Sequence, residues 1–162
     1  MDCLILADFV EEYWNVDDFD EIVDVANKIH GKFREKGNLV LSTIFDQNDD
    51  ISGETHRATL EVPKISFVRT FIDSPLNIEK LKSILIKNNI ENVFICGFPT
   101  EGVVYKIASN LLNKQNKILG QSVYLVNDGI SSLDENAEEE AISDLVESGA
   151  YLVESDIVLQ MI

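Results

Sequence analysis

The residues best placed to do chemistry in this sequence come directly after apolar runs that are typical of buried strands. Asp8 follows the run CLILA, Arg69 ends the run EVPKISFVR, and the segment 97–103 follows the run NVFIC. In open parallel sheets, ligands bind outside the carboxyl ends of the strands. We therefore expect a functional site where Asp8, Arg69 and the segment 97–103 meet. Asp46 and Asp128 also follow strand-like runs, but in those positions they are more typical of turns.

The segment from Gly97 to Tyr105 is expected to connect a strand with a helix through a short turn. A helix N-terminus offers free N–H groups and the positive end of the helix dipole, which lower the pKa of a nucleophile or bind an oxyanion. The alternative is an ordinary tight connection between the two elements. The sequence has no phosphate-cradling glycine motif and no Gly-x-Ser-x-Gly elbow. We therefore expect no cofactor and no serine nucleophile.

Apolar runs alternate with helical periodicity along the whole chain. The predicted strands are residues 3–7, 39–45, 61–69, 92–96, 122–126 and 150–153, with helices between them. Continuous apolar runs are typical of strands that are buried on both faces, as in parallel sheets. Right-handed crossovers then place helices on both faces of the sheet. The sequence thus predicts one α/β domain over residues 1–162, a three-layer α-β-α sandwich with a six-stranded, mostly parallel sheet.

The composition argues against several classes of partner. With 29 acidic and 13 basic residues, the chain has a formal net charge of −16, which repels nucleic-acid backbones and anionic membrane surfaces. No apolar run reaches the roughly 18 residues that span a bilayer, and the N-terminus lacks the basic region of a signal peptide. Both cysteines lie in apolar runs, and the two histidines share no metal-ligand spacing. We expect a cytoplasmic protein in a reducing compartment, without disulfides.

From residue 90 onward the sequence resembles the isochorismatase-like, or cysteine hydrolase, superfamily, which includes nicotinamidases, carbamoylsarcosine amidases and isochorismatases. The family pattern is an apolar strand followed by C/A-G-x-x-T-D/E-x-C-V and a helix. The residues that match are Cys96, Gly97, Thr100, Glu101 and Val104. The first strand, which ends at Asp8, also resembles the family's first strand and catalytic acid. The resemblance is specific over about 90–155 and loose over 9–75.

The resemblance places the family's nucleophilic cysteine on Val103 and its catalytic lysine on or beside Arg69 and Thr70. Valine has no nucleophilic atom, and a guanidinium stays protonated, so it cannot shuttle a proton as lysine does. Only Asp8 of the triad is kept, and thiol acyl transfer by the family route is not available. The metal motif Asp-x-His of nicotinamidases corresponds to Asp46-Gln47-Asn48. We therefore expect no metal.

Two classes of function remain. In the first, which we favour, the domain is non-catalytic and binds a small anionic molecule or a protein. In the second, it is a thiol-independent hydrolase in which Asp8 acts as general acid on a small anionic substrate, as the resemblance to true isochorismatases implies. The substrate-binding wall would be Phe98, Pro99, Thr100, Gly102 and Val103. A pocket above Asp8 that is plugged by Val103, Phe98 and Phe9 would favour the first class.

Three further expectations concern geometry and assembly. The charged groups of Asp8 and Arg69 are predicted to lie within salt-bridge reach across the strand ends. The peptide bond Phe98–Pro99 is predicted to be cis, because it aligns with a non-proline cis bond of the family. A cis bond costs about 3 kcal/mol before an ordinary residue and under about 1 kcal/mol before proline. The resemblance also implies a homo-oligomer, since family hydrolases are commonly dimers or larger.

Overall fold

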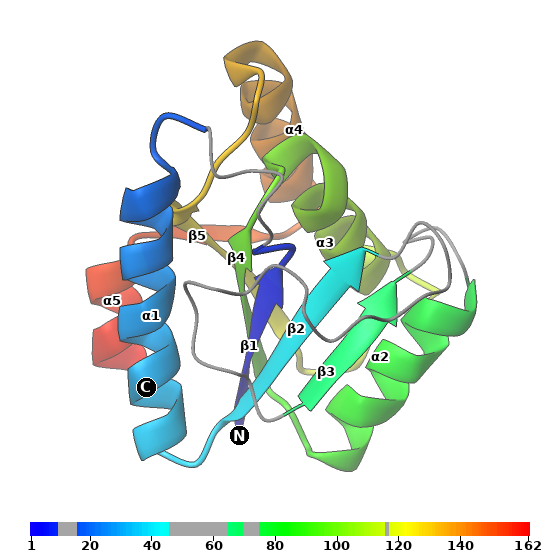
Figure 1. The fold of residues 1–162 in the computed structure, drawn as a ribbon. Helices are drawn as coiled ribbons and strands as arrows, with labels where there is room; N and C mark the ends of the chain where they lie inside the picture. The colour runs from blue at the N-terminus through cyan, green and yellow to red at the C-terminus, as the bar shows by residue number, and fades with distance from the viewer. Residues whose placement is uncertain (10–15, 46–64, 70–74, 116) are drawn as a thin grey trace.

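A computed structural model describes residues 1–9, 16–45, 65–69, 75–115 and 117–162, without the side chains of residues 44–45, 65–69 and 75–77. Strands and helices alternate along the described chain, as the sequence predicts (Figure 1). In chain order they are β1 (Asp2–Ala7), α1 (Phe19–Glu35), β2 (Leu39–Phe45), β3 (Ile65–Arg69), α2 (Pro75–Lys87), β4 (Asn92–Gly97), the π-helix η2 (Thr100–Val104), α3 (Tyr105–Leu112), β5 (Ser122–Ile130), α4 (Glu135–Glu147), β6 (Tyr151–Val153) and α5 (Ser155–Met161).

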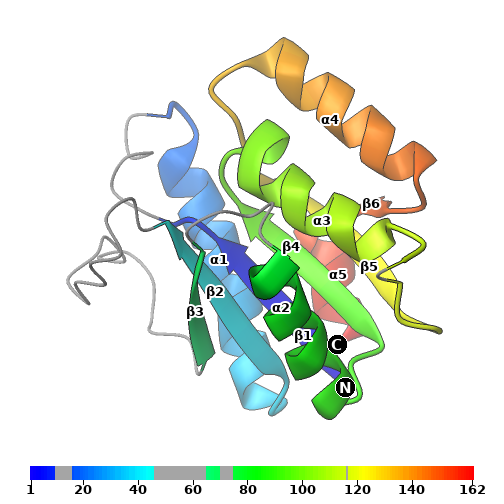
Figure 2. The same ribbon diagram turned by 90° about the vertical axis from the view of Figure 1, so that its right-hand side faces the viewer.

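The six described strands form one parallel sheet in the order β3-β2-β1-β4-β5-β6. Helices α1 and α5 cover one face, and α2, α3 and α4 cover the other (Figures 1 and 2). The predicted three-layer sandwich is therefore confirmed. The chain first builds the sheet outward from β1 to β3 and then returns to β4, so the strand order reverses between β1 and β4. A crevice for ligands is expected outside the carboxyl ends of these two strands.

The sheet has a separate apolar core on each face. Alternate residues of β1 face opposite sides: Leu4 and Leu6 join the core under α1, whereas Ile5 and Ala7 join the core under α2, α3 and α4. All four side chains are almost completely buried. This is the reason that the first strand is a continuous apolar run, and it makes β1 a rigid support for the residue that follows it.

Strand β5 is longer than predicted. It continues beyond residue 126 because a bulge opposite β4 absorbs the extra residues. Asp128 lies in this stretch, and its carboxylate accepts hydrogen bonds from the N–H and the hydroxyl of Ser155 at 2.8 and 2.5 Å. The Asn-Asp pair that is typical of a turn thus sits inside a strand, and Asp128 holds the first turn of α5.

Asp134 caps α4, since its carboxylate accepts hydrogen bonds from the N–H groups of Asn136 and Ala137. The polar stretch that includes Asp46, Gln47 and Asn48 lies outside the described residues. None of the helices that the structure describes is both long and apolar enough to cross a membrane.

Candidate functional site at the carboxyl edge

Asp8 stands at the carboxyl end of β1 and is buried. Its backbone is in the left-handed region, with φ +50°, a conformation that a non-glycine residue keeps only when its surroundings hold it. Thr43 at the end of β2 supplies part of that support. The Asp8 N–H donates to Thr43 Oγ1 at 3.2 Å, and the Thr43 hydroxyl donates to Asp8 Oδ1 at 2.7 Å. This reciprocal pair fixes both the backbone and the carboxylate of Asp8.

We expect Thr43→Val to lower the free energy of unfolding by about 1–3 kcal/mol, because it leaves a buried carboxylate oxygen and a buried N–H without this partner. Urea unfolding followed by circular dichroism measures the loss. Ser42→Ala is the matched control, since the buried Ser42 hydroxyl on the same strand has no hydrogen-bond partner in the described structure. It should change stability by no more than about 0.5 kcal/mol. Equal losses in the two variants would contradict a supporting role for Thr43.

The turn after β4 faces Asp8 across the point where the strand order reverses. Gly97 has φ +138°, and the following bond, Phe98–Pro99, is cis, which confirms that prediction. The chain then enters η2, in which the Val104 N–H donates to the Pro99 carbonyl at 3.3 Å, five residues back. Single π-turns of this kind are frequent at functional sites.

Most N–H groups of this turn are used within the fold. The Phe98 N–H donates to the Ala7 carbonyl, and the Thr100 N–H donates to the Ser131 carbonyl. The Gly102 N–H donates to the Pro99 carbonyl, and all three distances are 3.0 Å. Pro99 has no N–H. Within the segment 98–103, the N–H groups of Glu101 and Val103 are the remaining candidates to serve a ligand. Fewer N–H groups are therefore available to bind an anion than the sequence suggests.

Side chains of the turn tie it to its neighbours. The Thr100 hydroxyl donates to Glu138 Oε2 on α4 at 2.8 Å, and the Ser131 hydroxyl donates to Asp18 Oδ1, just before α1, at 2.7 Å. Burial raises the pKa of the Glu138 carboxyl, and the nearby charges of Asp18 and Glu101 raise it further. The hydrogen bond from Thr100 lowers this pKa, but by less than the other effects raise it. Thr100 is thus a buried connecting residue. The network also shows that carboxylates gather at this edge.

The aromatic residues of the site belong to the core under α1. The Phe98 ring has no exposed surface and lies between Phe9, at 5.2 Å edge-on, and Phe19, stacked at 5.4 Å. Val103 instead belongs to the core on the side of α3. Phe9 and Phe98 thus lie on one side of the sheet and Val103 on the other, and the Phe98 side chain cannot touch a ligand in this conformation.

No cysteine in the chain is placed to act as a nucleophile here. Cys3 and Cys96 are the two cysteines of the sequence, and both are completely buried inside β1 and β4. Burial, as the largest influence, raises the pKa of both thiols far above the ordinary value. Val103 occupies the first turn of the helix after β4 and is 5% exposed.

Arg69 ends β3, opposite Phe45 of β2, so one strand separates it from β1. The backbone thus brings Arg69 to the same sheet edge as Asp8. Its side chain, and all of Thr70, lie outside the described structure, and the predicted ion pair with Asp8 stays a prediction. Among the described residues, no three His, Cys, Asp or Glu side chains come together in a way that could hold a metal ion.

Comparison with known proteins agrees with this architecture. The family description "Isochorismatase domain" matches residues 2–157, while no curated protein sequence matches. Three similar solved structures are a pyrazinamidase from Pyrococcus horikoshii in complex with zinc, the MAR1 ribonuclease from Caenorhabditis elegans and a nicotinamidase from Bacillus subtilis. The pyrazinamidase is 25% identical over 94% of this chain and 98% of its own, with a TM-score of 0.77.

The other two are more distant in sequence. The ribonuclease is 20% identical over 98% of this chain and 79% of its own, with a TM-score of 0.76. The nicotinamidase is 15% identical over 95% of this chain and 100% of its own, with a TM-score of 0.73. At these identities the likeness is one of fold, whereas the family match covers nearly the whole chain. The chain belongs to the isochorismatase family.

Proposed function

We propose that this family member binds a small anionic ligand at its carboxyl edge and does not carry out thiol-dependent hydrolysis. The observation that supports the proposal is the place of Val103 in the first turn of the helix after β4, at the position that the resemblance assigns to the family's cysteine. Cys3 and Cys96 cannot replace that cysteine, because both thiols are sealed inside strands and resist ionisation.

The class of ligand follows from the groups around the crevice. Asp8, Glu101 and Glu138 give the described part of this edge a negative character, so an anion needs a cation as well as N–H donors. Arg69 ends its strand at this edge, and a guanidinium suits the paired oxygens of a carboxylate. The N–H groups of Glu101 and Val103 serve as further hydrogen-bond donors to this ligand. A small carboxylate therefore fits better than an RNA, whose phosphates the charge of −16 repels.

A second candidate function is thiol-independent hydrolysis with Asp8 as general acid. The observation that favours it is the geometry of Asp8, which is buried, held by Thr43 and kept in the left-handed region. Such outlying backbone conformations cluster at active sites. A buried carboxyl group is suited to hold and release a proton, as general acids do.

One experiment compares turnover with binding on matched compounds. The full chain is incubated with nicotinamide, pyrazinamide and carbamoylsarcosine, and separately with isochorismate, while binding of nicotinate and pyrazinoate is followed by isothermal calorimetry. We expect no turnover of the amides before or after treatment with iodoacetamide. We expect carboxylate binding that Arg69→Gln weakens by about tenfold or more, because hydrogen bonds to a charged group contribute about 1.5–3 kcal/mol.

The same experiment separates the alternatives. Hydrolysis of isochorismate that Asp8→Asn abolishes, and that iodoacetamide leaves unchanged, would establish the second candidate. Amide turnover that disappears on alkylation of Cys3 or Cys96 would overturn the assignment of the nucleophile position to Val103. Carboxylate binding that is the same in Arg69→Gln would remove Arg69 from the site.

A further inference from the structure

Three aromatic rings form a ladder across the last strands of the sheet. Phe94 of β4, Tyr124 of β5 and Tyr151 of β6 are paired in register. The rings of Phe94 and Tyr124 are stacked with centroids 4.8 Å apart, and those of Tyr124 and Tyr151 are stacked at 5.1 Å. Phe94 is completely buried, whereas Tyr151 is 55% exposed. The ladder therefore ends in a ring that has a stacking partner on its inner side and is open to solvent on its outer side.

Strand β6, where this ladder ends, is an edge strand of the sheet (Figure 2). It pairs with β5 alone in the described sheet, so its outer backbone N–H and carbonyl groups have no strand partner there. Tyr151 lies on the face covered by α1 and α5, and Leu152, which pairs with Leu125 of the other core, lies on the opposite face. Leu152 is 41% exposed. Outer backbone groups with an exposed apolar side chain on each face are features of an edge that accepts a further strand.

The part of the chain around β6 is uniformly acidic. From residue 118 to residue 162 the sequence contains no lysine, arginine or histidine, so every charged side chain is a carboxylate. Glu147 ends α4 just before β6, Glu154 and Asp156 follow the strand, and all three are exposed. Such surroundings attract a basic segment and repel an acidic one. A guanidinium in addition stacks on the face of a tyrosine ring, because its charge is attracted by the π-electrons.

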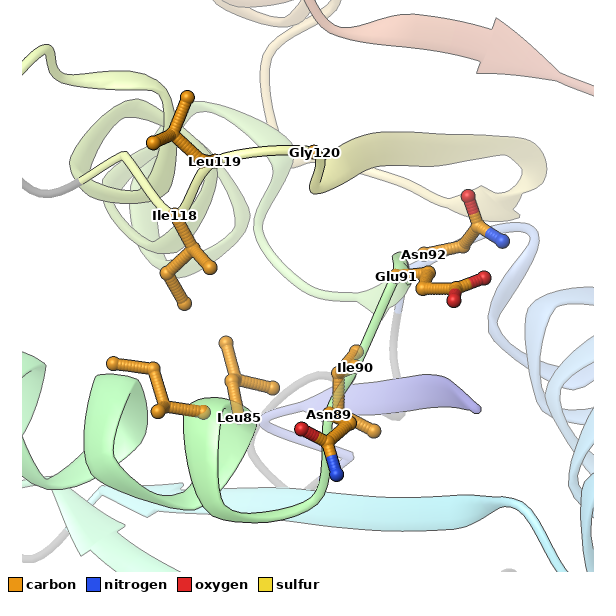
Figure 3. A pocket seen from close by; sticks show the side chains of 9 residues that line it. Leu85, Asn89, Ile90, Glu91, Asn92, Ile118, Leu119 and Gly120 are labelled. Atoms are coloured by element: carbon orange, nitrogen blue, oxygen red, sulfur yellow. The ribbon is translucent and has the colours of Figure 1, made fainter.

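Exposed apolar surface at the amino edge of the sheet has different surroundings. Leu119 is 99% exposed and helps to line a pocket of about 510 Å³ between the end of α2 and the turn before β5 (Figure 3). No aromatic residue lines this pocket, and Lys87 and Lys117 stand close to its lining residues in the sequence. The amino-edge pocket therefore offers an arginine neither a ring to stack on nor uniformly acidic surroundings, which makes Leu119 a suitable control position.

We propose that β6 is the docking edge for an extended, arginine-containing segment of a partner protein. The segment pairs with β6 through its backbone as a further strand, and it places an arginine side chain against the outer face of Tyr151, one strand spacing beyond the ladder. On the opposite face, an apolar side chain of the segment covers Leu152. Adjacent residues of a strand point to opposite faces, so a segment in which arginine and apolar residues alternate satisfies both contacts. The carboxylates at both ends of β6 steer the basic segment to this edge.

An NMR titration of the full chain at physiological salt tests this edge. The probe is a short acetylated and amidated peptide of alternating arginine and valine. We expect the backbone amide signals of β6 to shift, with a dissociation constant below about 1 mM, as for a small contact. A peptide with glutamate in place of arginine should not bind. Two further peptides carry N-methyl groups on all arginines or on all valines. One of them should bind at least about tenfold more weakly, because it lacks the N–H groups that face β6.

Substitutions in the chain separate the ring, the charge and the apolar surface. Tyr151→Leu should weaken binding of the arginine peptide by at least about fivefold, whereas Tyr151→Phe, which keeps the ring, should stay within about twofold. Leu119→Ser is the matched control and should bind as the natural chain does. Glu147→Gln should weaken binding by about two- to threefold, and Glu135→Gln, at the other end of α4, should leave it unchanged. A urea unfolding curve checks that each variant is folded.

Three outcomes would overturn the proposal. The first is the absence of β6 shifts at peptide concentrations up to about 5 mM. The second is equal affinity for the arginine and glutamate peptides, which would remove the charge selection. The third is a folded Tyr151→Leu variant that binds as tightly as the natural chain, or a larger loss in Leu119→Ser, since either result would place the peptide away from the ring of Tyr151.

Discussion

Gly97→Ala should unfold the protein more readily than any other single substitution in the carboxyl-edge site. A methyl group at this position would lie 2.0 Å from the carbonyl oxygen of Ala7, and the φ of +138° is one that alanine rarely adopts. The obstacle is backbone, which cannot swing away as a flexible side chain can. We expect a loss of at least about 4 kcal/mol in the free energy of unfolding, a large share of the stability of an ordinary domain. Thermal unfolding should shift down by about 10 °C or more.

The reason lies in how closely β1 and the β4 turn approach each other. The Ala7 carbonyl accepts a hydrogen bond from the Phe98 N–H at 3.0 Å, and the Gly97 carbonyl accepts one from the Ser131 N–H at 3.3 Å. Any displacement that makes room for a methyl group breaks this junction between β1, β4 and β5. The same displacement would move the cis turn away from Asp8, so ligand binding should be lost together with stability.

Gly31→Ala is the matched control. Gly31 lies within α1, and a methyl group there meets no atom within 4 Å outside its chain neighbours and the backbone of its own helix. Alanine is a better helix former than glycine, so this variant should gain up to about 1 kcal/mol. A Gly97→Ala protein that is as stable as the natural chain would mean that β1 and the turn are farther apart than the structure places them.

The layout of the fold was predictable from the sequence because its strands are buried on both faces. The runs CLILA, LVLSTIF and NVFIC contain almost no polar residue, and helical periodicity separates the first two. Those patterns are enough to predict a parallel sheet. The extent of β5 was not predictable, because the Asn127-Asp128 pair has the local signature of a turn. Contacts from Glu154 and Ser155, which are distant in sequence, keep it within the strand.

The candidate site was predictable in position but not in detail. Asp8 and the cis bond before Pro99 follow from strand ends and from the family pattern. Thr43, which holds Asp8, was missed, although a hydroxyl near the end of an otherwise apolar strand is a usable signal. The network of Thr100, Ser131 and Glu138 could not be foreseen, since it joins residues up to 38 positions apart. The burial of Phe98 among aromatic residues of α1 likewise depends on tertiary packing.

Val103→Cys should create a thiol that reacts far faster than either natural cysteine. Cysteine is slightly smaller than valine, so the variant should fold with a small loss of stability, about 1 kcal/mol. The new thiol would stand in the first turn of the helix after β4, where the helix dipole favours the thiolate. Cys3 and Cys96 are completely buried and react only when the structure opens. We expect alkylation of the new thiol by iodoacetamide to be at least about 100-fold faster than that of Cys96, with a midpoint below about pH 8.5.

Peptide mass spectrometry after timed alkylation measures all three thiols in one sample, so the two natural cysteines serve as internal references. Val104→Cys is the matched control, because Val104 is next in the same helix but is 0% exposed, compared with 5% for Val103. Its thiol should react as slowly as Cys96. If the thiol at position 103 were equally slow, that position would not face the crevice, and the correspondence between Val103 and the family's nucleophile would be wrong. A fast thiol would show instead that the scaffold still presents a nucleophile position, and that valine at this one residue is what removes the thiol chemistry.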